Sequence, residues 1–463
     1  MILIVENKKT VLWFRRDLRV DDSMLLSIKA NEVLPIFIFD KKILLELKSD
    51  DKRVDYIFKK VIQLKDELKK YSLDLAIFYA DVIDVFKYLK SKAYDEVYAS
   101  VDYDNYARKR DEEVAKIINF IPLYDCYIYE PREILKKDSS PYVVFSPYYK
   151  EAKQVYTKEH SLKYELETNK LSSFEFFDYI NEFKENKLIQ KTLSIDTIGF
   201  KQNSIKYESP LKKLKQLKSK LISYKDLRDY LNEDATSNLS VDLRFGTISI
   251  RSILRELITL KKQGFDTEAF FRQLVFRDFY ASLLYHFPKL HTQDFRSYAP
   301  YSFNKDYYEK FISAKTGVPI IDAGVSELLT TGYMHNRVRM IVASFFCKHL
   351  MLPWQKGEAF FAKHLMDYDA ASNILSWQWS SSTGIDAQPY FRVFNPYLQA
   401  KKFDKDALYI KKHLKALSNV NAKDIHDEDF LFSNTIKGYT KPIIKHKFAR
   451  EHFLSESKKF LNN

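Results

Sequence analysis

Tyr333-Met334-His335-Asn336-Arg337-Val338-Arg339-Met340 begins the most informative segment of this chain, which ends at Asp404. The same segment contains Asp367-Tyr368-Asp369, Asn373 and Trp377-Gln378-Trp379. It also holds three of the 4 tryptophans in the chain. Scarce indoles beside charged residues indicate a binding site, although packing alone would also gather them.

The stretch from Asn336 to Met340 lies in a predicted helix, because apolar residues recur around it at three- and four-residue spacing. At helical pitch Asn336 and Met340 share one face, with an arginine on either flank. Arginines so close to an apolar face need anionic partners, which Asp367 and Asp369 offer. The pattern leaves open whether Arg339 and Asp367 form a structural ion pair or part of a site.

Trp377 and Trp379 are two positions apart, so their side chains point to nearly opposite sides in a helix or a strand. One indole would then face a buried ligand and the other a ligand on the solvent side, unless both pack in the core. His335, His349 and His364 form no zinc-binding pattern with cysteines or carboxylates, so no metal site is predicted.

The stretch Thr236-Ser237-Asn238-Leu239-Ser240 precedes a further helical run. Hydroxyl groups and unpaired backbone N–H groups at a helix start favour phosphate oxygens. A plain N-cap explains the same residues without a ligand.

Composition describes a folded chain with a surplus of positive charge. A content of 46% hydrophobic residues in 463 excludes a mostly disordered chain. The net charge of +13 favours a polyanionic partner, nucleic acid before membrane, unless the lysines merely solvate the surface. Cys126 and Cys347 are too few for a disulfide framework or an iron–sulfur site. With no signal-peptide pattern and no apolar run of membrane-spanning length, we expect a cytoplasmic protein.

Three regions are predicted along the chain. Residues 1–130 alternate apolar runs with amphipathic helices, which predicts an α/β domain with a parallel sheet. The expected elements are strands at Thr10–Phe14, Val33–Phe39, Leu73–Tyr79 and Glu96–Ala99 and a helix at Asp55–Lys70. Residues 131–203 lose this periodicity and are predicted to be an interdomain linker. Residues 204–463 are predicted to form a larger, all-helical domain.

Further motifs occur in order along the chain. They are Trp13-Phe-Arg-Arg-Asp-Leu-Arg19, Thr236-Ser-Asn-Leu-Ser240, Lys315-Thr-Gly-Val-Pro-Ile-Ile-Asp322, Gly332-Tyr-Met-His-Asn-Arg-Val-Arg-Met340, Trp377-Gln-Trp-Ser-Ser-Ser-Thr-Gly384 and Pro389-Tyr-Phe-Arg-Val-Phe-Asn-Pro396. Together they resemble the photolyase/cryptochrome family, and most of all its class I cyclobutane pyrimidine dimer photolyases. The resemblance covers essentially the whole chain. It implies a Rossmann-like antenna domain followed by a helical domain that binds FAD and DNA.

The resemblance also implies roles for particular residues. Those expected at the flavin are Tyr224, Thr236, Ser237, Asn238, Leu239, Ser240, Arg339, Asp367, Asp369 and Asn373, with Asn373 beside the flavin N5. Those expected along the DNA groove and in the lesion pocket are Arg228, Gln273, Phe276, Arg277, Asn336, Arg337, Met340, Trp379, Arg392 and Lys402. Trp377 and Trp354 would relay electrons to the flavin, and the remaining catalytic residues would be Asn373, Asn336 and Met340.

The activity implied by the family is light-driven repair of pyrimidine dimers. Reduced, excited FAD donates an electron to the dimer, the cyclobutane ring splits, and the electron returns. The lesion must leave the duplex first, which suits a basic face leading to an aromatic, uncharged pocket. The expected partner is UV-damaged DNA, and we expect a monomer without membrane association or an obligate protein partner.

Several positions in the expected lesion pocket depart from the family pattern. Gln273 stands where dimer photolyases usually carry a glutamate, and Phe276 replaces a tryptophan, so a carboxylate and an indole N–H are lost. Ile374-Leu375-Ser376 replaces a glycine-containing run. Asn336 and Met340 stand where (6-4) photolyases carry histidines, which argues against that specificity.

Phe311 occupies the third position of the tryptophan relay. Phenylalanine is much harder to oxidise than tryptophan, so photoreduction is expected to be slow or re-routed. The tyrosines that lie nearby in the sequence are Tyr298, Tyr301, Tyr307 and Tyr308.

The antenna segment also departs from one branch of the family. Folate-binding members carry Asn-Glu where this chain has Tyr106-Ala107. The segment from Asp102 to Arg110 instead resembles members that use a deazaflavin or another pigment. A deazaflavin-like or other second chromophore is therefore expected rather than methenyltetrahydrofolate.

Two other functions compete with repair. A cryptochrome-type blue-light photoreceptor that binds FAD without repair is favoured by Gln273 and Phe276. A basic nucleic-acid-binding protein without flavin would explain the charge alone, but not the ordered motifs. Repair of pyrimidine dimers is the function that the sequence predicts.

Overall fold

The computed structural model describes residues 9–30, 32–167, 171–172, 179–185, 187–296 and 300–461. By packing, the chain forms two compact units, each built from several segments. Unit 1 comprises Met1–Ile134, Glu151–Lys218 and Ser237–Asp278, and unit 2 comprises Leu135–Lys150, Ser219–Thr236 and Phe279–Asn463. The domain boundaries expected after residues 130 and 203 stay a prediction.

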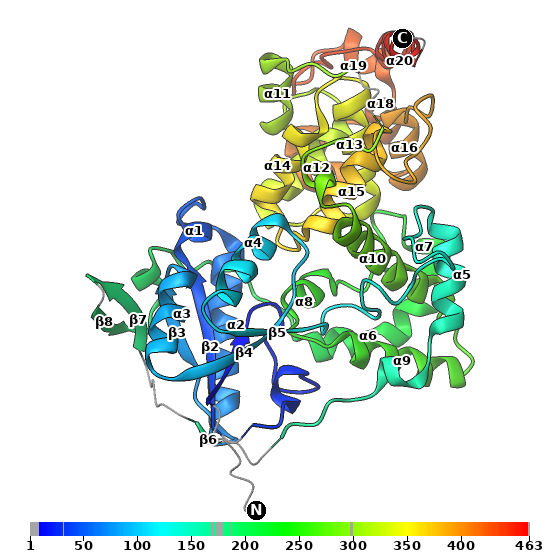
Figure 1. The fold of residues 1–463 in the computed structure, drawn as a ribbon. Helices are drawn as coiled ribbons and strands as arrows, with labels where there is room; N and C mark the ends of the chain where they lie inside the picture. The colour runs from blue at the N-terminus through cyan, green and yellow to red at the C-terminus, as the bar shows by residue number, and fades with distance from the viewer. Residues whose placement is uncertain are drawn as a thin grey trace, which may run out of the picture. The chain divides into compact units, whose positions relative to one another are not determined.

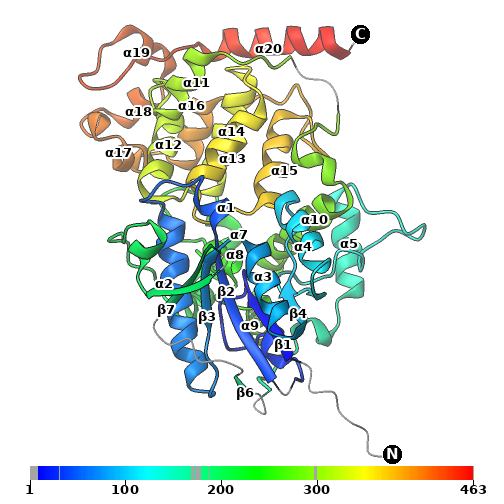
Figure 2. The same cartoon turned by 60° about the vertical axis from the view of Figure 1, so that its left-hand side comes forward.

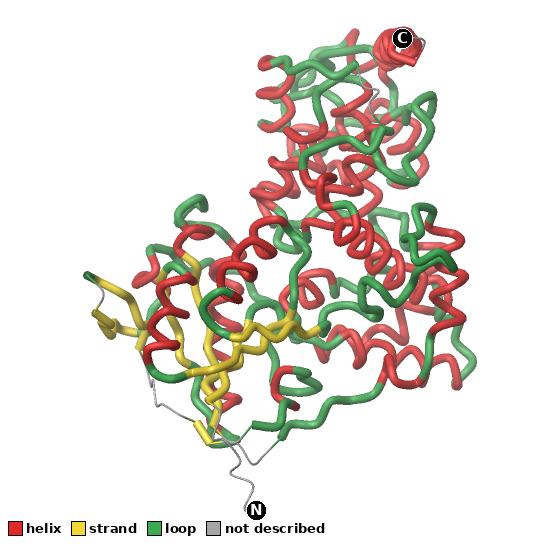
Figure 3. The backbone as a smooth tube through the Cα atoms, in the orientation of Figure 1, coloured by secondary structure: helices red, strands yellow, loops and turns green. Residues whose placement is uncertain are grey.

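Unit 1 contains an eight-stranded sheet. Its strands are β1 Lys9–Phe14, β2 Glu32–Asp40, β3 Ala76–Ala80, β4 Tyr94–Ser100, β5 Asn119–Leu123, β6 Leu171–Ser172, β7 Tyr179–Lys184 and β8 Lys187–Thr192. Their order is β5-β4-β1-β2-β3-β7-β8, with β6 beside β2. Most of the strands are labelled in Figure 1, and all are yellow in Figure 3. All pairings are parallel except that of β7 with β8. The predicted parallel sheet is confirmed, and all four predicted strands are present.

Helices cover both faces of this sheet. Trp13 of β1 contacts Phe86 of α3 (Val82–Ser91), with ring centroids 4.9 Å apart. Phe39 of β2 contacts Phe58 of α2 (Lys52–Lys69), with ring centroids 5.8 Å apart. Because successive residues of a strand point to opposite faces, burial on both sides requires the near-continuous apolar runs that the sequence shows. The other helices lying wholly in this unit are α1 Lys41–Leu44, α4 Asn105–Ala115, α8 Ser240–Phe245 and α9 Ile250–Lys262.

The predicted linker is more regular than expected. It contains α5 (Phe145–Val155) and the hairpin of β7 and β8, which extends the sheet beyond β3. The regular elements in these parts of residues 131–203 were not predicted, and the interdomain linker itself stays a prediction. The strand pattern is weak because polar and charged residues interrupt the apolar ones, and Ile180 and Asn181 are the fully buried residues of the hairpin.

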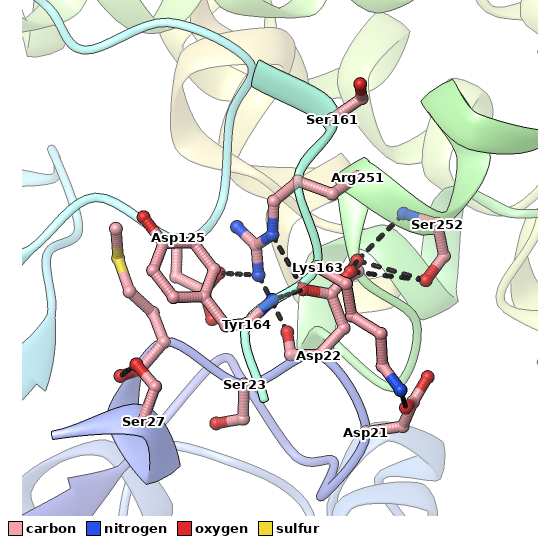
Figure 4. A network of polar contacts seen from close by, with 12 residues as sticks. Asp21, Asp22, Ser23, Ser27, Asp125, Ser161, Lys163, Tyr164, Arg251 and Ser252 are labelled. Carbon is pink, nitrogen blue, oxygen red and sulfur yellow. Dashed lines mark hydrogen bonds and ion pairs between the residues drawn. The ribbon is translucent and has the colours of Figure 1, made fainter. Parts of the chain in front are cut away.

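A buried ion network joins the loop after β1 to α9 within unit 1 (Figure 4). The carboxylate of Asp22 accepts hydrogen bonds from Ser249 at 2.6 Å, Arg251 at 2.8 Å and Arg255 at 2.6 Å. Arg251 also pairs with Asp125 at 2.6 Å. Burial alone would raise the pKa of Asp22, but Arg251 and Ser249 lower it overall. The network thus replaces the lost hydration of several buried charges.

Unit 2 is helical in its described residues. Its helices are α7 Tyr224–Leu227, α11 Lys305–Ile312, α12 Pro319–Thr331, α13 Asn336–Lys348, α14 Trp354–His364, α15 Ala370–Ser381, α16 Pro396–Phe403, α17 Leu408–His413, α18 Ala422–Ile425, α19 Glu428–Ser433 and α20 His446–Leu461. Helices α6 (Pro210–Leu221) and α10 (Glu268–His286) each contribute to both units. Helices α12, α13, α14 and α15 pack against one another (Figure 2). Among the described residues, no helix combines the length and the apolar character that crossing a membrane requires.

His349 gives unit 2 a predicted dependence on pH. It is 3% exposed, and its Nε2 lies 2.9 Å from Nδ1 of His446. Burial lowers the pKa of His349 to about 3. Between pH 6.5 and 3, His349 is protonated in the unfolded chain but neutral in the folded chain. The free energy of unfolding therefore decreases as pH falls from 6.5 towards 3. Between pH 6.5 and 4.5, we expect the free energy of unfolding of the wild type to fall by about 2 kcal/mol more than that of His349→Gln, as measured by urea unfolding. Parallel stability curves would contradict this expectation.

Candidate functional site

An ion pair between α13 and the segment before α15 forms the centre of the candidate site. Nη2 of Arg339 lies 3.0 and 2.9 Å from the two carboxylate oxygens of Asp367. Nε of Arg339 donates to the carbonyl group of Met334 at 2.7 Å. The Asp367 side chain is 6% exposed and that of Arg339 is 25% exposed. The ion pair offered as one alternative by the sequence is therefore present, and its guanidinium is fixed in orientation.

Asn373 is oriented by a neighbouring helix. Its Nδ2 donates to Oε1 of Glu358 at 2.9 Å and to the carbonyl group of Glu358 at 3.3 Å. The hydroxyl of Tyr368 donates to the same Glu358 carboxylate at 3.3 Å. Because Nδ2 is turned towards Glu358, Asn373 presents Oδ1, an acceptor, on its other side. Asp369 caps the start of α15, the helix that contains Asn373, and its carboxylate accepts from the backbone N–H of Ser372 at 3.2 Å.

Trp377 is enclosed by aromatic rings and one glycine. It is 1% exposed, and its ring lies 4.9 Å from Phe361 and 5.4 Å from Phe346. A β-carbon at Gly357 would stand 2.3 Å from its indole, so the close contact requires glycine. Trp379, two positions further, is partly exposed, as predicted for the opposite side of a helix.

Trp354 is also buried, at 1% exposure, and starts α14. Its indole N–H donates to Oδ1 of Asp294 at 2.6 Å. An anionic acceptor on the indole N–H stabilises positive charge on the ring, which favours oxidation of this tryptophan.

Thr236 and Tyr224 belong to the same unit as Arg339. Tyr333 lies between Thr236 and Arg339. It shares a hydrogen bond with the Thr236 side chain, and its ring lies 5.7 Å from the Arg339 guanidinium. The carbonyl group of Thr236 accepts from Lys220 at 2.7 Å. Tyr224 is buried at the start of α7. Thr236 is thus connected to the ion pair through Tyr333.

The residues from Ser237 to Ser240 belong to unit 1. Asn238 has a left-handed backbone with a φ of 56°, which asparagine tolerates better than most residues. Leu239 is buried and receives its local support from Ser237, whose hydroxyl accepts from the Leu239 N–H at 3.4 Å. Ser240 is exposed and starts α8. The predicted helix start is confirmed, and the phosphate role stays a prediction.

Two of the residues expected to bind DNA in unit 2, Arg337 and Lys402, lie beside Phe403. The Arg337 guanidinium lies 4.4 Å and the Lys402 ammonium 5.1 Å from the Phe403 ring. Arg337 also pairs with Asp229 at 2.8 Å, so a phosphate would have to replace this carboxylate. The others lie separately: Arg228 stands 5.5 Å from the Tyr224 ring, Arg392 is exposed, and Nδ2 of Asn336 lies 3.7 Å from Sδ of Met340.

Gln273, Phe276 and Arg277 lie on one face of α10 in unit 1, at the spacing that brings helical side chains together. Gln273 and Phe276 are partly buried. Arg277 donates to the carbonyl groups of Cys126 at 2.6 Å and Leu243 at 3.4 Å. Its guanidinium is therefore engaged within its own unit, and a role of Arg277 in DNA binding stays a prediction.

Comparison with known proteins identifies the family. Residues 10–166 match DNA photolyase, and residues 270–459 match the FAD binding domain of DNA photolyase. The chain is 34% identical to the deoxyribodipyrimidine photo-lyase of Alkalihalophilus pseudofirmus over 96% of each chain. It is 32% identical to that of Synechococcus sp., covering 96% of this chain and 95% of the relative. The protein belongs to the photolyase/cryptochrome family.

Solved structures support the same fold. A bacterial class III photolyase from Agrobacterium tumefaciens superposes with a TM-score of 0.84 at 27% identity, over 99% of both chains. An archaeal photolyase from Sulfolobus tokodaii with two FAD molecules has a TM-score of 0.79 at 30% identity, over 97% of this chain and 100% of the other. The predicted combination of an N-terminal parallel α/β domain with a helical FAD-binding domain is confirmed.

Sequence reasoning missed Glu358 and Asp294. Glu358 fixes the amide of Asn373, and Asp294 binds the indole of Trp354. The signal for Glu358 was weak: it is a carboxylate in an otherwise apolar stretch of α14, 15 positions before Asn373. A buried amide such as that of Asn373 needs a hydrogen-bond partner, and this need was a reason to consider a helical carboxylate such as Glu358.

Proposed function

We propose that this protein repairs cyclobutane pyrimidine dimers in DNA by light-driven electron transfer from bound, reduced FAD. The observation that carries the proposal is the joint presence in unit 2 of the fixed Arg339–Asp367 pair and of Asn373 held by Glu358. The relatives named deoxyribodipyrimidine photo-lyase support it. The class I subtype belongs to the same proposal, although similar solved structures include a class III photolyase.

The residues of unit 2 fit a flavin chemically. When bound, FAD supplies a one-electron donor that absorbs light. Arg339 and Asp367 together carry no net charge, so they provide a fixed dipole rather than a stranded charge. Oδ1 of Asn373 offers an acceptor for an N–H group, because Nδ2 is bound by Glu358. Both arrangements are present in the protein without a bound ligand.

Binding of DNA is proposed to use exposed cations. Arg392 and Lys402 are exposed, and phosphate contacts by such groups supply most of the affinity and its salt dependence. Arg337 is preset by Asp229 and would exchange that partner for a phosphate. Trp379, partly exposed, offers a ring face on which an unstacked base can lie.

The deciding experiment uses an oligonucleotide that carries one thymine dimer. The purified protein with its flavin fully reduced is mixed with it and illuminated, and restored thymines are counted against a dark control. Light-dependent restoration is the expected result. A reduced, flavin-loaded protein that restores none would overturn the proposal.

A blue-light photoreceptor is the second candidate, because Gln273 and Phe276 replace the glutamate and tryptophan usual in dimer repair. Restoring both residues by Gln273→Glu and Phe276→Trp distinguishes the two functions. A repair rate that changes less than about threefold would show that the natural pair is a tolerated variant. Repair that appears only in the restored protein would favour the photoreceptor.

Photoreduction is proposed to be re-routed through Tyr308. Phe311 is fully buried, which differs from the surface position expected of a relay terminus, and a larger indole there would be overpacked. The Phe346 ring lies 5.4 Å from Trp377 and 6.4 Å from Tyr308. Tyr298 lies outside the described residues.

We expect Tyr308→Phe to slow light-driven reduction of the bound flavin about tenfold, because it removes the oxidisable phenol that contacts Phe346 on this path. Absorbance of oxidised flavin under constant blue light in the presence of a reductant measures the rate. Tyr307→Phe is the matched control and should leave it unchanged. Equal rates in all three proteins would exclude this route.

A second chromophore, deazaflavin-like or other, is proposed for the α/β domain rather than methenyltetrahydrofolate. Tyr106 replaces the folate-binding pattern, and its hydroxyl donates to the Asp40 carboxylate. Asp102 is held by Arg16 at 2.7 Å and Arg244 at 2.9 Å. Asp40 and Asp102 thus each already have a partner within the domain, and position 107, where the folate branch carries its glutamate, is an alanine. The spectrum of pigment extracted from the natural protein tests the assignment.

A further inference from the structure

Lys348, the last residue of α13, is a buried cation held by backbone carbonyl groups. Its side chain is 0% exposed, and its ammonium donates to the carbonyl groups of Arg392 at 3.0 Å and Tyr390 at 3.4 Å. Among the ion pairs of the described residues, none includes Lys348. A buried charge without a carboxylate persists only where hydrogen bonds compensate for lost hydration.

Both carbonyl groups belong to residues 389–394, a segment that exposes the Arg392 side chain. The segment is anchored at its two ends. Gln388 donates to the backbone of α15 at 3.0 Å, and Asn395 caps α16. Lys348 therefore holds the middle of the segment, between these two anchors.

A purely local role does not explain Lys348. A cation at a helix C-terminus normally stabilises its own helix through the last carbonyl groups. Here the ammonium donates to a different segment, to carbonyl groups that lie 42 and 44 positions further along the chain. Burial lowers the pKa of Lys348 to about 7, because holding an ammonium at this position costs free energy that an apolar residue would avoid. Its three N–H donors are what a methionine of similar length would lack.

We propose that Lys348 is a positioning residue for DNA binding, which fixes residues 389–394 so that Arg392 is presented to a phosphate of the DNA backbone. The inference rests on the proposed function, because it takes Arg392 as a DNA contact. It deepens that function by assigning the geometry of the contact to a buried residue that touches no DNA.

The first test observes the segment without DNA. Trypsin cleaves after an accessible arginine, so cleavage at the Arg392–Val393 bond reports how well the segment is held. We expect Lys348→Met to speed this cleavage about tenfold, because local opening is no longer opposed by the two hydrogen bonds. Lys458→Met, which removes an exposed lysine of α20, is the charge-matched control and should cleave like the wild type. Flavin content and thermal unfolding verify the fold, and Lys348→Gln replaces Lys348→Met if the latter does not fold.

The second test is a double-mutant cycle on DNA affinity, with Lys348→Met, Arg392→Ala and their combination. Arg392→Ala is expected to weaken binding of a dimer-containing duplex about tenfold and to reduce the salt slope by about one. Lys348→Met should have a similar effect alone and add less than about twofold when Arg392 is already alanine.

Each outcome is informative. Unchanged cleavage in a folded Lys348→Met protein, or additive losses in the cycle, would overturn the inference. If Arg392→Ala binds as tightly as the wild type, Arg392 is not a DNA contact and the inference fails. The repair assay with the wild type then decides separately whether the proposed function also fails.

Discussion

We expect Arg339→Met to lower the free energy of unfolding by about 3 kcal/mol and to abolish flavin binding. The substitution strands the Asp367 carboxylate, whose side chain is 6% exposed, and removes the bond to the Met334 carbonyl group. The uncompensated buried charge of Asp367 is the main cause of the loss. We expect a loss at the lower end of the usual range for buried ion pairs, because the Arg339 side chain is 25% exposed. Urea unfolding and the flavin absorbance of the purified protein measure the two effects.

Arg339→Met combined with Asp367→Leu separates a structural pair from a functional one. The double variant carries no stranded charge, so most of the lost stability should return. If the pair serves the flavin, flavin affinity should remain at least about a hundredfold weaker, because the fixed dipole is gone. Recovery of stability and flavin binding together would show that the pair is structural alone.

The fold was predictable where the apolar pattern is strong and local. Residues Asn336–Lys348 form a helix as predicted, because their period of 3.6 reflects burial against neighbouring helices. The β7–β8 hairpin was not predicted, because strand pairing depends on distant partners. Asn181 of β7 bonds to the carbonyl group of Ile77, 104 positions earlier, and no local pattern encodes this contact.

The site was predictable as a set of residues but not as a geometry. The need of buried arginines for counter-ions predicted a partner such as Asp367 for Arg339, and that contact exists. Glu358 was missed because its importance arises only when α14 and α15 are packed together. The complete burial of Phe311 could not be predicted either, because a single aromatic residue gives the same sequence pattern at a surface and in a core. The roles of the individual residues towards flavin and DNA stay predictions.

We expect Gly357→Ala to lower the free energy of unfolding by about 2–3 kcal/mol, although alanine is the better helix former. Gly357 lies in α14, and a β-carbon there would stand 2.3 Å from Cη2 and 2.4 Å from Cζ3 of Trp377. The indole cannot retreat, because Phe346 and Phe361 enclose it at ring distances of 5.4 and 4.9 Å. Thermal and urea unfolding of the purified variant measure the loss.

The Trp377→Phe background shows whether this contact is the cause. The colliding atoms are the outer carbons of the indole's benzo ring, and the smaller phenylalanine side chain has no atoms in their place. In that background Gly357→Ala should be neutral or stabilise the protein by up to about 1 kcal/mol, as helix propensity alone dictates. A similar loss in both backgrounds would place the clash elsewhere. A sign reversal would establish that α14 carries glycine in order to hold Trp377, so that the position of the proposed electron relay is set by a residue that takes no part in it.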